Sequence, residues 1–198
     1  MKDSKRYELT HEGQSAIICG SAPCLLEEFD EAWHNLPHAK VIAVNESASV
    51  VRADFLCSYH AEKFNEFKAK SLNPDAKTIT GKGFRSEEED RGIDYRFENI
   101  KIGATSCGDA VQIATMMGFS EIVIVGAPMN GNDGYFNKTP MFQDGCHRFG
   151  SSGYSSETRQ LEINQQVLAS LVTVLPDVKS MSGFTREIFG GPKWQIQT

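Results

Sequence analysis

Residues 15–24, Ser-Ala-Ile-Ile-Cys-Gly-Ser-Ala-Pro-Cys, carry the strongest fold signal in the chain. The first five residues form a short apolar run that ends at a turn, as is typical of a strand buried on both faces of a sheet. Gly20, Ser21 and Ala22 then form a turn of small residues, and Leu25–His34 follows with acidic residues in its early turns, as helix N-termini prefer. This succession predicts the first strand, turn and helix of an α/β fold.

The same alternation recurs along the chain. Further strands are predicted at Lys40–Val44, Asp54–Cys57 and Glu121–Val125, with Lys77–Thr80 as a weaker strand and Tyr95–Phe97 as an edge strand. Helices are predicted at His60–Lys70, Gly108–Met117 and Ser155–Ser170, whereas Val172–Leu175 fits either a strand or the end of a helix. We therefore expect an α/β, Rossmann-like fold with a mostly parallel sheet and helices on both faces.

The length of 198 residues fits one domain. The stretch from Met129 to Tyr154 is rich in glycine and aromatic residues and has little periodicity. Loops of this length inside a compact domain are usually functional, often as lids. We expect a single Rossmann-like domain over residues 1–198, with residues 129–154 as a lid or insertion loop.

The charge and the N-terminal sequence exclude several classes of protein. The formal net charge is −6 and no basic stripe occurs, which disfavours nucleic acid as a partner. The first ten residues lack the apolar core of a signal peptide, and no apolar run is long enough for a transmembrane helix. We expect a cytoplasmic protein, and the oligomeric state is left open, with a homo-oligomer among the alternatives.

The five cysteines are widely spread along the chain, and no Cys-x-x-Cys pair occurs. Three of them lie in or just beyond apolar strand-like runs, which is typical of small buried side chains in a reducing compartment. The sequence therefore predicts no metal site and no metal cofactor.

Polar residues with ligand-binding chemistry follow the predicted strands. Gly20, Ser21 and Ala22 follow the first strand, Asn45 ends the second, and Thr105 and Ser106 precede the helix that leads to Glu121–Val125. Because parallel strands end at one edge of their sheet, these residues are predicted to bind a nucleotide or a nucleotide-like ligand there. An ordinary turn, a turn-closing asparagine and helix capping explain the same residues without a ligand.

Two histidines stand near this predicted site. His147 lies beside an arginine in the glycine-rich loop and has the chemistry of a general base or acid, although a plain surface histidine is the simpler interpretation. Ser58-Tyr59-His60 follows the third strand at the equivalent level, where a histidine is more often a packing or helix-start residue.

Taken together, these segments resemble a known family. The turn Gly20–Pro23, the strand end at Asn45 and the block from Thr105 to Gly126 are similar, in order and spacing, to the bacterial sialyltransferases of glycosyltransferase family forty-two and to the DUF115 or MptE-like proteins. The resemblance covers residues 15–182. It implies a Rossmann-like fold that holds a nucleotide, a CMP-sugar in the sialyltransferases, between the first turn and Thr105-Ser106.

The resemblance further implies an inverting transfer of the sugar to an acceptor hydroxyl, with His147 as the general base. Two alternatives stay open. One is an MptE-like pterin diphosphokinase that uses ATP and magnesium. The other is a non-catalytic nucleotide-binding or assembly protein, favoured because Gly126-Ala127-Pro128 stands where the sialyltransferases have Gly-Ile-Asp.

Overall fold

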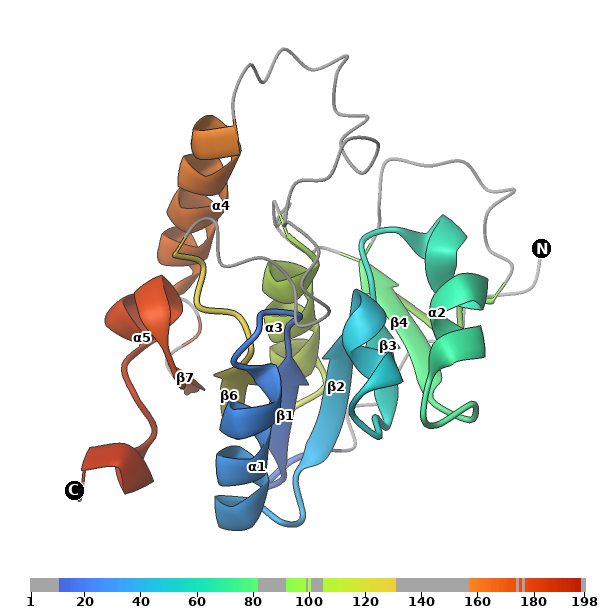
Figure 1. The fold of residues 1–198 in the computed structure, drawn as a ribbon, viewed down its shortest axis with the longest axis horizontal. Coiled ribbons are helices and arrows are strands. Elements are labelled where there is room, and N and C mark those ends of the chain that lie inside the picture. Colours follow the sequence, from blue (N-terminus) through green and yellow to red (C-terminus); the bar gives the residue numbers. More distant parts are fainter. Residues whose placement is uncertain are drawn as a thin grey trace.

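The computed structural model describes residues 11–81, 92–98, 100, 105–130, 157–173, 175 and 177–196. In this part of the chain seven strands form one open sheet, in the order β5-β4-β3-β2-β1-β6-β7, and every neighbouring pair is parallel (Figure 1). Their bounds are Ser15–Cys19 (β1), Lys40–Val44 (β2), Phe55–Cys57 (β3), Lys77–Gly81 (β4), Tyr95–Phe97 (β5), Glu121–Val125 (β6) and Val178–Ser180 (β7). The predicted Rossmann-like fold is confirmed.

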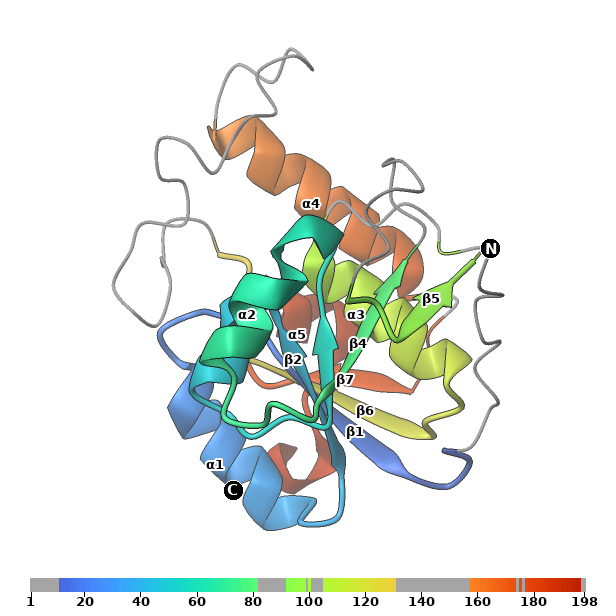
Figure 2. The same cartoon turned by 90° about the vertical axis from the view of Figure 1, so that its right-hand side faces the viewer.

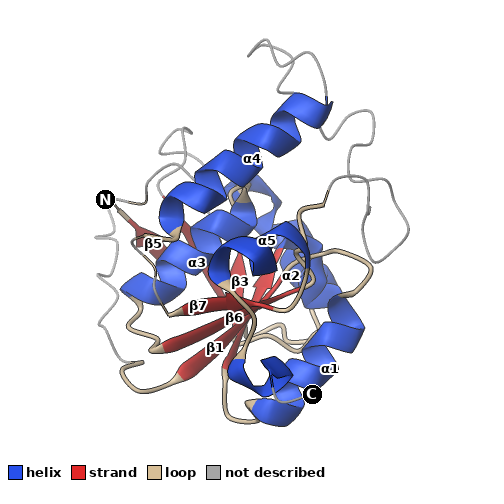
Figure 3. Ribbon diagram, turned by 90° about the vertical axis from the view of Figure 1, so that its left-hand side faces the viewer, coloured by secondary structure: helices blue, strands red, loops and turns tan. Residues whose placement is uncertain are grey.

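Helices connect the strands and cover both faces of the sheet (Figures 2 and 3). The α-helices are Leu25–Asn35 (α1), Phe64–Lys70 (α2), Ser106–Met116 (α3), Glu157–Leu171 (α4) and Gly183–Phe189 (α5), and the short 3-10 helices are Asn45–Ser49 (η1), Ala61–Lys63 (η2) and Lys193–Ile196 (η4). No helix in the described ranges is long and apolar enough to cross a membrane.

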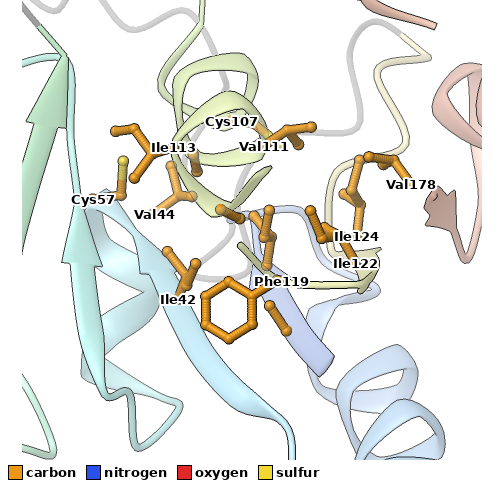
Figure 4. Close-up of a cluster of buried hydrophobic side chains, with 14 of the residues drawn as sticks. Ile42, Val44, Cys57, Cys107, Val111, Ile113, Phe119, Ile122, Ile124 and Val178 are labelled. Carbon is orange, nitrogen blue, oxygen red and sulfur yellow. The ribbon is translucent and has the colours of Figure 1, made fainter. Parts of the chain in front are cut away.

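Alternation along the strands divides the core into two clusters, one on each face. On one face, Ile17 and Val123 pack with Leu25 of α1 and with Phe64 and Phe67 of α2. On the other face, the strand residues pack against α3, whose buried side chains include Val111 and Ile113 (Figure 4). Because both faces are covered, the central strands are apolar at nearly every position, which is why they were recognisable in the sequence.

The C-terminal part of the fold differs from the sequence prediction. Of the two alternatives for Val172–Leu175, the strand is not present at the described positions: helix α4 ends at Leu171, and Val172 lies in the turn after it. The edge strand is Val178–Ser180, and α5 begins directly after it at Gly183. β7 contains a single apolar residue, Val178, so the sequence shows no apolar run there.

Candidate functional site

The candidate site is the carboxyl edge of the sheet, the upper edge in Figure 1. The strand order reverses beside β1, because the chain passes from β1 outward to β5 and returns with β6 on the other side of β1. In open parallel sheets, ligands bind outside the carboxyl ends of the strands at such a reversal. The turns after β1, β2 and β3 and the N-terminus of α3 come together at this edge.

The turn after β1 is tightly packed against the end of β6. The amides of Gly20 and Ala22 donate to the carbonyls of Val125 and Gly126, both at 2.8 Å. The Ser21 hydroxyl donates to the carbonyl of Val44 at 3.4 Å, which links this turn to the end of β2. The amides of Gly20 and Ala22 are thus occupied by β6, and ligand binding by Gly20, Ser21 and Ala22 stays a prediction.

The first turn of α1 carries a carboxylate that is also part of this packing. Glu28 accepts a hydrogen bond from the amide of Gly126 at 2.7 Å. Burial, followed by the negative charge of Glu28, raises the pKa of the Cys24 thiol to about 11. Cys24 is therefore a thiol at neutral pH, and because thiolates are the reactive species, it is a poor nucleophile.

Asn45 occupies a special backbone position at the end of β2. Its φ is 56°, in the left-handed region that asparagine tolerates better than most residues. Its side-chain oxygen accepts a hydrogen bond from the Ser58 hydroxyl at 2.7 Å, and Ser58 in turn accepts from the amide of His60 at 2.9 Å. This chain of bonds fixes the orientation of the Asn45 amide group. The nitrogen Nδ2 is left to donate, and no acceptor for it occurs among the described residues.

Thr105 and Ser106 form the N-terminus of α3. The Thr105 hydroxyl caps the helix by accepting from the amide of Gly108 at 2.9 Å. The Ser106 hydroxyl accepts from the amide of Tyr59 at 3.1 Å, which joins α3 to the turn after β3. The hydroxyl hydrogen of Ser106 has no acceptor in the described part of the chain.

Ser58-Tyr59-His60 bridges the two predicted contacts. Ser58 is bonded to Asn45, and Tyr59 is bonded to Ser106. The sequence placed this segment at the right level but did not reveal that it orients both Asn45 and Ser106. The feature that marks this role is the full burial of Ser58 directly after β3. Burial of a single serine cannot be read from the sequence, so the role was missed.

The cysteines nearest the site are buried beneath it. Burial raises the pKa of Cys107 to about 12 and that of Cys57 well above its ordinary value, and in both cases the nearby Asp109 raises it further. Both thiols thus behave as small apolar side chains, in agreement with the sequence interpretation. In the described ranges, no group of three or more histidine, cysteine or acidic side chains is arranged to hold a metal ion.

The loop after β6 is bound to α5 as far as Asn130. The side-chain oxygen of Asn130 accepts from the amide of Phe184 at 2.8 Å, at the N-terminus of α5. His147 and most of the predicted lid lie outside the described residues.

Of the seven predicted site residues, the structure describes six and places all six at the carboxyl edge of the sheet. Asn45 and Ser106 are connected through the turn after β3, and Ser21 reaches the end of β2. Comparison with models of protein families and with curated proteins finds no match to this chain.

Proposed function

We propose that this protein binds a nucleotide or nucleotide-sugar at the carboxyl edge of its sheet and transfers the sugar to an acceptor hydroxyl. The observation that carries the proposal is the pair of oriented hydrogen-bond donors, Asn45 Nδ2 and the Ser106 hydroxyl. Both belong to half-buried residues, and neither donor has an acceptor among the described residues.

Free, oriented donors at a strand reversal favour a ligand that is rich in acceptors. Donors that are held in place and have no protein acceptor are suited to a ligand that supplies oxygens. The N-terminus of α3 adds the amides of Ser106 and Cys107, since that of Gly108 is bonded to Thr105, and free N–H groups and the helix dipole favour an anion there. Nucleotides combine acceptor-rich bases and ribose with an anionic phosphate.

The sequence resemblance to the sialyltransferases supports a glycosyl transfer. The turn Gly20–Pro23, Asn45 and Thr105-Ser106 lie at one edge, as a nucleotide bound between the first turn and α3 would require. In the scheme that the resemblance implies, His147 deprotonates the acceptor hydroxyl, and the donor is a CMP-sugar.

A thermal-shift screen against CMP, a CMP-sugar, UDP, GDP, a pterin, and ATP with and without Mg²⁺ tests the proposal. A ligand at about a hundred times its Kd stabilises the fold by about 2.7 kcal/mol, which is a shift of a few degrees in Tm for a chain of this length. We expect the largest shift with the cytidine nucleotides. A response to ATP only with Mg²⁺ would favour the diphosphokinase instead, and binding without turnover would favour the non-catalytic protein.

Asn45→Gly sharpens the test, because glycine adopts the positive φ of this position without strain while the amide donor is removed. We expect the cytidine-dependent shift in Tm to disappear in this variant. Asn35→Ala, at the end of α1 and the opposite edge of the sheet, is the matched control and should keep the shift. Unchanged melting of the wild-type protein with every nucleotide at millimolar concentration would contradict the proposal.

A further inference from the structure

His60 lies at the same edge of the sheet, and its side chain is not among the ligand contacts proposed above. Its backbone amide donates to Ser58, which also holds Asn45, and its neighbour Tyr59 is bonded to Ser106. The position of His60 is therefore fixed by the same hydrogen bonds that orient the two proposed ligand contacts.

The imidazole itself is held on one side and accessible on the other. Its Nδ1 lies 3.3 Å from a carboxylate oxygen of Glu62, and the ring of Tyr59 packs edge-on against it at 5.6 Å between centroids. About one third of the His60 side chain is exposed (34%). Nε2 has no partner within the described ranges. Glu62 is the charged group that contacts the ring there.

The Glu62 carboxylate can only accept a hydrogen bond, so Nδ1 carries a hydrogen in this contact, and Nε2 becomes a second donor when the imidazole is protonated. The donors at Asn45 and Ser106 are uncharged, so they recognise oxygens without neutralising a phosphate. A protonated histidine at the same edge of the sheet would provide the missing charge, and hydrogen bonds between charged partners are the strong ones.

We propose that His60, oriented by Glu62, is the phosphate-binding side chain of the nucleotide site. This inference rests on the proposed function and goes beyond it by dividing the ligand between two kinds of contact. Asn45 and Ser106 bind the nucleoside part through uncharged hydrogen bonds, and His60 binds the phosphate through charge. The phosphate contact then weakens as the pH rises and the imidazole loses its proton.

The experiment compares two ligands whose own charge is constant between pH 5.5 and 8.0: cytidine, which is neutral, and cytidine 5′-(methyl phosphate), a diester with one negative charge. Calorimetric titration gives the Kd of each at both values of pH. For the wild-type protein we expect the affinity for the diester to fall about tenfold between pH 5.5 and 8.0, the size of one charge-assisted contact. The affinity for cytidine should stay constant.

His60→Gln should bind the diester with the same affinity at both pH values, at about the level of the wild type at pH 8.0, and should bind cytidine normally. Glu62→Ala, which removes the group that holds Nδ1, should weaken diester binding at pH 5.5 and leave the affinity for cytidine unchanged. His34→Gln, with an exposed histidine at the end of α1 and the opposite edge, should keep the full pH dependence.

The two proposals fail in different ways. If neither cytidine nor the diester binds at millimolar concentration, the nucleotide site itself is wrong, and the phosphate contact with it. If both ligands bind and the diester shows no pH dependence, or if His60→Gln keeps that dependence, the role of His60 is overturned while the nucleotide site stands.

Discussion

Gly20 lies where the end of β6 meets the turn after β1. A Cβ atom at this position would come within 2.3 Å of the Gly126 carbonyl oxygen and 2.8 Å of the Ala127 Cβ. The first of these neighbours is backbone that is itself hydrogen-bonded to the same turn, so it cannot move aside easily. Glycine is required here because the turn after β1 and the loop after β6 approach each other closely.

Gly20→Ala should therefore destabilise the fold by about 3 kcal/mol, at the upper end of the range for overpacked sites. Urea unfolding measures the change. Gly13→Ala is the comparison, because its added methyl group meets nothing within 4 Å and only the positive φ of 77° opposes it, which costs about 1 kcal/mol. A loss at Gly20 no larger than the loss at Gly13 would show that the two loops separate without penalty.

At the scale of residues, the sequence showed which positions carry polar groups but not which of them are buried. Ser47 and Ser49 stand two residues apart in one short polar stretch and look equivalent. The structure buries Ser47, whose hydroxyl accepts from the amide of Val44 and donates to the carbonyl of Cys19, whereas Ser49 bonds only within its own turn. Such contacts join segments distant in sequence, so no local pattern predicts them.

At the scale of elements, a buried hydroxyl of α5 connects this helix to its two neighbours. The Thr185 side chain is fully buried, donates to the carbonyl of Ala127 at 2.8 Å and lies 2.7 Å from the Ser180 hydroxyl. It thereby connects α5 to β7 and to the loop after β6. No sequence pattern indicates α5, because seven residues complete only two turns and tertiary contacts decide whether so short a segment is helical.

Thr185→Val keeps the shape of the side chain and removes its hydroxyl. Because the Ala127 carbonyl and the Ser180 hydroxyl lose a partner in a buried place, we expect a loss of about 1–3 kcal/mol in the free energy of unfolding. Thr185→Ser keeps the hydroxyl and should cost less, about 0.8 kcal/mol for the lost methyl group. Equal losses for the two variants in urea unfolding would mean that the methyl group, and not the hydroxyl, holds α5.

At the scale of the whole molecule, the sequence was sufficient for the two-faced sheet because β1, β2 and β6 are apolar over nearly their whole length. It was not sufficient for the strand order, because parallel strands pair across long crossovers that leave no local signal.

The two core clusters, one on each face of the sheet, contain three cysteines, with Cys19 on the face of α1 and Cys57 and Cys107 on the face of α3. Burial raises the pKa of all three thiols.

Because the pKa values of these thiols are raised in the folded chain, we expect the free energy of unfolding to fall in alkali. Below a pH of about 8.5, the ordinary pKa of cysteine, the thiols are protonated in both the folded and the unfolded chain. Above it the unfolded chain releases the protons and the folded chain keeps them, up to about pH 12 for Cys107, so the free energy of unfolding falls as the pH rises. Each thiol contributes a slope of about 1.4 kcal/mol per pH unit in this range.

Urea unfolding of the wild type and of Cys107→Ala between pH 8 and 10.5 isolates the contribution of one thiol. The cavity left by the substitution lowers the stability at every pH, and lysines and tyrosines titrate alike in both proteins, so only the difference in slope matters. We expect the slope of Cys107→Ala to be shallower than that of the wild type by about 1.4 kcal/mol per pH unit above pH 9. Parallel slopes would mean that Cys107 ionises as readily in the folded chain as in the unfolded one, and hence that water reaches the core beneath α3.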